Sequence, residues 1–129
     1  MESILLDTNV LIALSDPENE LFQLTEKAVR IGKRACTCSV AWHEYIRGPL
    51  KAVDHDRALR VIESRIHSLE RTDAEFAASL FNQSGRRRGS TADCLIAAVA
   101  IHHDAELLTN NRSDFDLFVP YGLRLVDLD

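Results

Sequence analysis

The chain has few of the residues that divide a protein into separate units. Its 129 residues include only three prolines and five glycines, and no stretch rich in Ser, Gly or Pro interrupts them. We find no internal repeat and no low-complexity segment. A chain of this length with 46% hydrophobic residues can bury one core. The sequence therefore predicts a single domain that spans residues 1–129.

Long apolar runs are also missing. The longest, residues 94–101, is far shorter than the ~20 residues that cross a bilayer. Because Glu2 stands where a basic region would begin, we expect no signal peptide and no membrane partner. An odd count of three cysteines favours a reducing, cytoplasmic compartment. Cys36 and Cys38 fit small core residues better than a redox pair or a zinc site, which would need further paired ligands.

Several motifs of well-known enzyme classes are absent. No Gly-x-x-x-x-Gly-Lys-Ser/Thr loop occurs, which excludes a P-loop NTPase, and no Gly-x-Ser-x-Gly elbow occurs, which excludes an α/β-hydrolase. The absence of Gly-x-Gly-x-x-Gly argues against a dinucleotide-binding fold.

The chain also lacks an excess of basic residues. The formal net charge of −5 gives no global attraction to nucleic acid, although divalent cations at an acidic site would reverse the local charge.

What the sequence does contain is an alternation of strand-length and helix-length segments. Strands are predicted near residues 4–6, 35–39, 107–108 and 123–126, with a short edge strand near 66–69. Helices are predicted from residue 10, over 21–31, after a Ser39 cap, over 58–66, from a capping box at 72–75 and from Ser90. This alternation predicts an α/β fold of three layers, with a central parallel sheet of four to five strands.

Acidic or amide side chains follow these apolar segments. Asp7 comes directly after the first, and Glu44, Asp93 and the Asn111/Asp114 pair either follow an apolar segment by a few residues or open a helix. In a parallel sheet these points meet at one edge, where ligands bind. Clustered carboxylates repel one another unless a cation joins them, and hard oxygen ligands suit Mg²⁺ or Mn²⁺. Such a site suits phosphate-ester substrates, and two ions could together support an in-line displacement.

Each of these residues also has a simple structural explanation. Asp7 fits a helix N-cap, and Asp93 fits Ser-x-x-Asp capping from Ser90. Glu44 fits a solvated helix residue, while the amides and the acid at 110–114 fit a turn. The site is indicated by all of them together rather than by any one alone.

Four segments in order carry a resemblance to a known family. They are LLDTN at 5–9, SVAWHE at 39–44, ADCLIAA at 92–98 and LTNNRSDF at 108–115. With this order and spacing across nearly the whole chain, the sequence resembles a PIN domain, and specifically the VapC-type toxins of type II toxin–antitoxin pairs. The resemblance implies a Mg²⁺-dependent endoribonuclease, with Mn²⁺ as the alternative ion. Such an enzyme hydrolyses RNA with a metal-activated water and leaves 5′-phosphate and 3′-hydroxyl ends.

The resemblance also implies roles for individual residues. By match, Asp7, Glu44 and Asp93 are catalytic carboxylates that bind the metal. Many relatives carry Asp where this chain has Asn111, so either Asp114 supplies the missing charge, as a catalytic metal ligand, or Asn111 only positions water or phosphate.

Two further roles follow from the same match. Thr8 and Asn9 are expected to brace Asp7, as outer partners of metal ligands do. Thr109 is expected to hydrogen-bond a carboxylate or the substrate.

The expected partners are an RNA substrate, an antitoxin that covers the acidic pocket, and a second copy in a homodimer. Arg86, Arg87 and Arg88 form the densest basic run, which fits either an RNA-backbone contact or a solvated loop.

Three other functions stay open. A PIN-type RNA-processing nuclease outside a toxin–antitoxin pair shares the motifs, and Asn111 permits a catalytically weak binding module. A metal-dependent phosphatase would normally show Asp-x-Asp, where this chain has Asp7-Thr8-Asn9.

Overall fold

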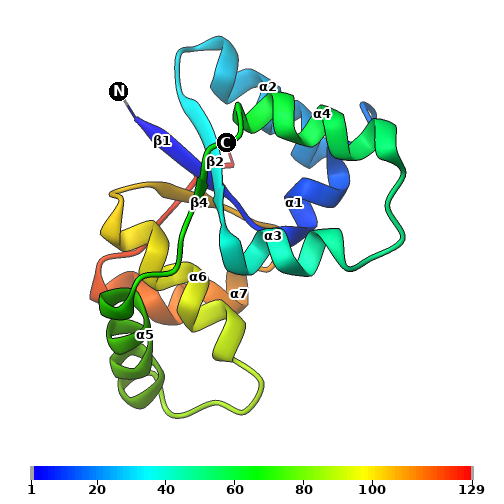
Figure 1. The fold of residues 1–129 in the computed structure, drawn as a ribbon. Helices are drawn as coiled ribbons and strands as arrows, with labels where there is room; N and C mark the ends of the chain where they lie inside the picture. Colours follow the sequence, from blue (N-terminus) through cyan, green and yellow to red (C-terminus); the bar gives the residue numbers. More distant parts are fainter. Residues whose placement is uncertain (1, 129) are drawn as a thin grey trace.

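A parallel sheet of five strands forms the centre of the molecule, whose residues 2–128 are described by a computed structural model (Figure 1). The strands are β1 (Ser3–Leu6), β2 (Arg34–Cys38), β3 (Ile66–His67), β4 (Glu106–Leu108) and β5 (Arg124–Leu125). Their order across the sheet is β3-β2-β1-β4-β5, and all four neighbouring pairs are parallel. The predicted parallel sheet is confirmed.

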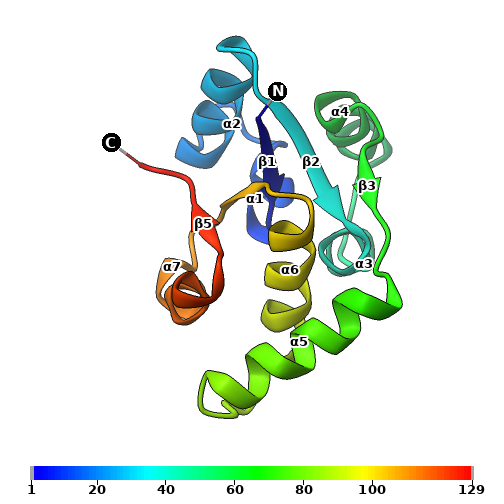
Figure 2. The same ribbon diagram turned by 90° about the vertical axis from the view of Figure 1, so that its left-hand side faces the viewer.

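Helices cover both faces of this sheet. They are α1 (Thr8–Ala13), α2 (Glu20–Arg30), α3 (Ser39–Ile46), α4 (Ala52–Ile62), α5 (Arg71–Gln83), α6 (Thr91–His102) and α7 (Arg112–Phe115), with a 3-10 helix η1 (Asp116–Tyr121). Figures 1 and 2 show α1 to α4 on one face and α5 to α7 on the other. The predicted three-layer α/β fold is confirmed.

The strand order creates a reversal point between β1 and β4. The connection that leaves β1 crosses one face toward β2, whereas the connection into β4 comes from α6 on the other face. In open α/β sheets a crevice opens at the carboxyl ends of the strands where the order reverses. The backbone N–H of Asp7 donates to the carbonyl of Leu108 at 3.1 Å, so the segments that follow β1 and β4 lie side by side at this point.

The two central strands explain the apolar runs in the sequence. Side chains of Ile4, Leu5, Leu6, Leu107 and Leu108 are at most 1% exposed, because helices cover both faces. Full burial of one such side chain stabilises the fold by about 1.5–3 kcal/mol. The core therefore anchors the strands whose ends carry the site.

Some predicted helix boundaries are wrong. Ser39 lies inside α3 instead of capping it, and its hydroxyl accepts a hydrogen bond from the Leu69 backbone at 3.2 Å. Ile66 belongs to β3, because α4 ends at Ile62 where Glu63 takes a left-handed conformation.

The capping box of α5 is also shifted. Glu70 is the N-cap, and its backbone N–H donates to the Asp73 carboxylate at 3.0 Å. The box predicted at 72–75 is therefore wrong both in register and in its N-cap residue, which is Glu70 and not Thr72.

The three cysteines are unpaired and buried, as expected for core residues. Burial raises the pKa of both Cys36 and Cys38 to about 11, so these thiols stay neutral. Among the described residues, no helix combines the length and apolarity needed to cross a membrane.

Candidate active site

Asp7 lies where β1 ends and α1 begins, and three hydrogen bonds hold its carboxylate. Its Oδ1 accepts the Thr8 backbone N–H at 2.8 Å, and its Oδ2 accepts the Thr109 hydroxyl at 2.7 Å and the Asn9 amide at 3.1 Å. Only 4% of the residue is exposed. Burial raises the pKa of Asp7, the donors from Thr109, Thr8 and Asn9 oppose that rise, and the charge of Glu44 adds to it. The N-cap explanation is therefore correct as far as it goes, but it uses only one of the two carboxylate oxygens.

Glu44 reaches the same region from α3. The Thr8 hydroxyl donates to Glu44 Oε1 at 2.9 Å, with the Ala41 carbonyl 3.4 Å away. Thr8 thus contacts Asp7 through its backbone and Glu44 through its side chain, whereas the sequence analysis assigned it to Asp7 alone. Asn9 contacts Asp7 as expected.

Asp93 comes from the first turn of α6 on the opposite face of the sheet. Its side chain is 27% exposed. Burial raises the pKa of Asp93 to about 6, and the negative charges of Asp7 and Asp114 contribute to the rise. The alternative role as a capping residue does not apply, since Ser90 makes no side-chain cap and donates its hydroxyl to the Arg87 carbonyl at 2.7 Å.

These three carboxylates share one hollow of about 320 Å³. The hollow is lined by Asp7, Thr8, Asn9, Ile12, Glu44, Arg47, Asp93 and Asn111. They come from α1 and the loop before it, from α3, from α6 and from the loop after β4, elements far apart in the sequence. The structure therefore brings together most of the side chains that the sequence singled out.

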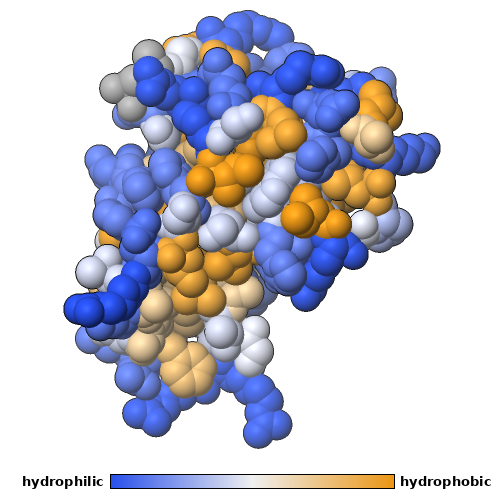
Figure 3. All heavy atoms as spheres, viewed as in Figure 1, coloured by the Kyte–Doolittle hydropathy of each residue, from blue (hydrophilic) through white to orange (hydrophobic). Residues whose placement is uncertain are grey.

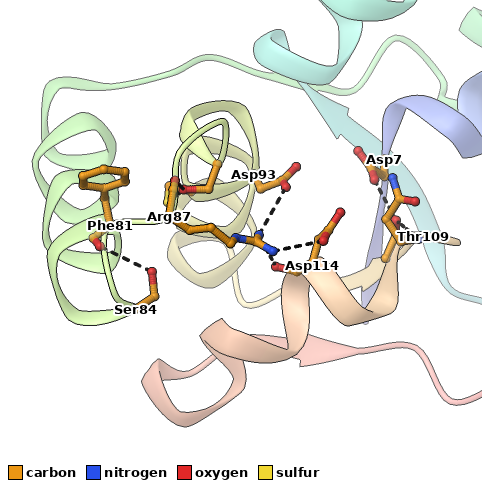
Figure 4. A network of polar contacts seen from close by, with 10 residues as sticks. Asp7, Phe81, Ser84, Arg87, Asp93, Thr109 and Asp114 are labelled. Carbon is orange, nitrogen blue, oxygen red and sulfur yellow. Dashed lines mark hydrogen bonds and ion pairs between the residues drawn. The ribbon is translucent and has the colours of Figure 1, made fainter.

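Asp114 stands beside the hollow rather than among the residues that line it. Arg87 connects it to Asp93, with Nη1 3.1 Å from Asp114 Oδ1 and Nη2 4.0 Å from Asp93 Oδ2 (Figure 4). Arg87 Nη2 also donates to the Asp114 carbonyl at 3.3 Å. The three arginines, which the sequence groups in one run, therefore differ: Arg87 pairs with the two acids, and Arg86 and Arg88 are exposed.

Two residues of the hollow were not among the principal sequence candidates. Arg47 follows Glu44 by three positions and so lies on the same side of the helix. Ile12 follows Thr8 by four positions and is 57% exposed at the rim. Helical spacing from an acidic or hydroxyl residue of the site is the signal that would have found both.

Thr109 and Asn111 connect the β4 loop to the acids. The Asn111 backbone N–H donates to the Thr109 hydroxyl oxygen at 3.0 Å, and that hydroxyl donates onward to Asp7. The Asn111 side chain faces the hollow, while Thr109 is 1% exposed. Thr109 thus orients a carboxylate, one of the two roles expected for it.

The donor set fits a hard divalent cation. Among residues 2–128, no three or more His, Cys, Asp or Glu side chains have the spacing of a formed metal site. The chemistry of the hollow nevertheless suits Mg²⁺ or Mn²⁺, because its candidate ligands are carboxylate and amide oxygens. Burial, with a smaller contribution from neighbouring carboxylates, raises the pKa of Asp7 and of Asp93, so a bound cation would favour their ionised forms. Asp7, Glu44 and Asp93 are the residues that would hold such an ion.

A five-stranded parallel sheet with carboxylates gathered at its reversal point defines an α/β protein with an acidic hollow at that edge. Within that class the chain belongs to the PIN domain family, whose model matches residues 4–117. Membership implies nuclease activity, which in this family is generally dependent on divalent metal.

Solved structures share the fold over nearly the whole chain. A chain in the crystal structure of VapBC2 from Rickettsia felis bound to a promoter DNA fragment is 22% identical, with TM-score 0.72 and coverage of 98% of this chain and 99% of that one. One in FitAcB from Neisseria gonorrhoeae is 18% identical, with TM-score 0.75 and 97% of both chains covered. One in a toxin–antitoxin complex from Klebsiella pneumoniae is 25% identical, with TM-score 0.68 and coverage of 89% and 90%. No curated protein matches the sequence at a significant level.

Proposed function

We propose that this protein is a Mg²⁺-dependent endoribonuclease that acts as the toxin of a toxin–antitoxin pair, with Mn²⁺ as an alternative ion. One observation carries the proposal: carboxylates from three separate elements, Asp7, Glu44 and Asp93, line a single hollow. Membership of the PIN family and the likeness to toxin–antitoxin complexes support the choice of reaction and of biological setting.

In this proposal the carboxylates hold the metal, and the polar neighbours hold the carboxylates. Asp7, Glu44 and Asp93 bind the ion, and Asp114 adds charge beside Asp93. A bound ion supplies Lewis acidity, which lowers the pKa of a water and offsets negative charge on the phosphodiester. Thr109 and Asn9 keep Asp7 oriented, as Thr8 does for Glu44.

The RNA backbone requires positive charge near this acidic hollow. Arg47 lines the hollow directly, and Arg86 and Arg88 are exposed on the loop that precedes α6. These side chains can contact phosphates on either side of the bond that is cut. Such local contacts are needed because the chain as a whole carries a net charge of −5.

A protein antitoxin and a second copy of the chain are the proposed partners, and the cytoplasm is the proposed compartment. A hollow of about 430 Å³ between α2 and α4 offers the apolar side chains of Phe22, Val29 and Val61 to such an antitoxin. Another, of about 290 Å³, lies between α5 and α6 and supports pairing with a second copy.

The function is tested by incubating the purified protein with total RNA in Mg²⁺ or in EDTA. Asp7→Asn and Asp93→Asn are expected to lower cleavage by more than about 100-fold, because even outer partners of metal ligands are worth 10–100-fold. Asp56→Asn, an exposed change on α4, serves as the matched control and should cleave like the wild type. Cleavage that survives the two site variants would remove the assigned residues from the mechanism.

Expression in a bacterial host separates the biological alternatives. The proposal predicts growth arrest that Asp7→Asn relieves and that co-expression of an antitoxin encoded beside the gene suppresses. RNA cleavage without arrest favours an RNA-processing nuclease, and absence of both favours a binding module.

A further inference from the structure

Arg87 occupies an unusual position for a loop arginine in an acidic protein. Its guanidinium lies between the carboxylates of Asp93 and Asp114, which belong to different elements (Figure 4). The side chain is 40% exposed, and Asp93 and Asp114 are 27% and 45% exposed. The planar, permanently charged guanidinium is well suited to join two carboxylates at once.

The backbone beneath Arg87 is anchored, so this contact is built into the loop. The Arg87 carbonyl accepts the Ser90 hydroxyl at 2.7 Å and the Ser90 backbone N–H at 3.3 Å. Ser90 itself is 2% exposed at the start of α6. Arg86 and Gly89 on either side take left-handed conformations, with φ of 56° and 83°, which gives the loop a defined shape. Arg86 and Arg88, on either side of Arg87, are exposed.

We infer that Arg87 is an internal counter-cation that holds the Asp93–Asp114 side of the pocket and limits the site to one divalent ion, bound by Asp7, Glu44 and Asp93. The inference rests on the proposed metal-dependent function and specifies its stoichiometry. A second divalent ion shared by Asp93 and Asp114 would meet the guanidinium at close range, and like charges repel. Such an ion could bind only after Arg87 had left its carboxylates.

The test is the number of ions bound, which is independent of any activity. The full-length protein is titrated with Mn²⁺ and followed by calorimetry and by the electron paramagnetic resonance signal of free Mn²⁺. The wild type is expected to bind one ion, and Arg87→Gln to bind two. The first ion is expected to bind roughly threefold to tenfold more tightly in Arg87→Gln, since one nearby positive charge has gone. Arg88→Gln removes the same charge from the same loop and should bind like the wild type.

A second set of variants keeps the inference testable if Arg87→Gln is poorly folded. Asp114→Asn should still bind one ion, and the double variant Arg87→Gln/Asp114→Asn should lose the second ion that Arg87→Gln gains. Arg87→Lys retains the charge and should stay at one ion. The fold of every variant is checked by circular dichroism before titration.

The outcomes separate this inference from the proposed function. One ion in both the wild type and Arg87→Gln, with equal affinity, overturns the role of Arg87 and leaves the metal-dependent function intact. Two ions bound to the wild type would also overturn the role of Arg87 and leave the metal-dependent function intact. Absence of Mn²⁺ binding in every form overturns the proposed function, and the inference with it.

Discussion

At the scale of single residues, the surroundings of each carboxylate decide how far its pKa is raised. Asp7 is almost fully buried but receives three hydrogen bonds, which oppose the effect of burial on its pKa. Burial, together with the charges of Asp7 and Asp114, raises the pKa of Asp93 to about 6, and Arg87 at 4.0 Å only partly opposes the rise. Ionisation of Asp93 therefore lowers the stability of the protein when no metal is bound.

This cost leads to a prediction for Asp93→Asn. A carboxyl whose pKa is raised from 3.8 to about 6 on folding contributes stability below pH 3.8, and that contribution is lost as the pH rises through about 6. Asn cannot ionise, so the variant keeps this stability at neutral pH. We expect Asp93→Asn to be more stable than the wild type by about 1–2 kcal/mol at pH 7.5. This is less than the full shift implies, because the side chain is partly exposed.

Urea unfolding in EDTA at pH 7.5 and pH 4.5 measures this difference, which should shrink at the lower pH. Asp56→Asn should stay within about 0.5 kcal/mol of the wild type at both. If Asp93→Asn were less stable than the wild type at pH 7.5, the assigned cost of ionising Asp93 would be contradicted.

At the scale of elements, the start of α5 depends on one buried acid. Asp73 is 2% exposed, accepts the Glu70 backbone N–H at 3.0 Å and lies 2.8 Å from His102 Nδ1 on α6. The same side chain therefore caps α5 and joins it to the helix that carries Asp93. This places a structural acid at the far end of the helix pair from the candidate active site.

Replacing this acid should loosen the helix pair. We expect Asp73→Ala to lower the free energy of unfolding by about 1–3 kcal/mol, because it removes the cap and leaves two polar partners unsatisfied. Glu75→Ala, two positions later on the exposed side of α5, should change it by less than about 0.5 kcal/mol. Thermal and urea unfolding of both variants test the comparison, and equal losses would show that the capping box contributes little.

At the scale of the whole molecule, apolar surface is distributed unevenly. Figure 3 shows apolar side chains gathered over α5 and α6 on the face seen in Figure 1. The groove there is lined by Ala77, Phe81 and Leu95, with Ala74 and Ala78 exposed at its edge. Contiguous apolar surface of this kind favours burial against another protein surface.

The proposed homodimer makes this groove a testable interface. Light scattering after gel filtration should show a dimer for the wild type and a monomer for Ala78→Arg, because the new charge would be buried without a partner. Ala52→Arg introduces the same side chain at an exposed position at the start of α4, and this variant should remain dimeric. A dimer that persists in Ala78→Arg would move the interface to another face, and a monomeric wild type would remove the dimer from the proposal.

The sequence by itself determined the sheet and the main acids. The apolar run at 4–6 can be buried only in a strand covered on both faces, and Asp7 follows it immediately, so local pattern and site coincide there. Glu44 follows a later apolar segment and Asp93 opens a helix, and these positions predicted that both lie at the same edge. Helix starts at Ser39 and at 72–75 were misplaced because cap preference alone does not fix where a helix begins: α3 begins after Cys38, which makes no side-chain cap, and α5 begins after Glu70.

Only the tertiary structure decided how charge is arranged around those acids. Arg86, Arg87 and Arg88 are identical side chains in one run, and nothing local distinguishes the one that turns inward. The choice depends on the loop shape set by Ser90 and on Asp114, which lies 27 positions away in the sequence. Contacts across such separations follow from how the layers pack, because only packing brings the loop after α5 and helix α7 together.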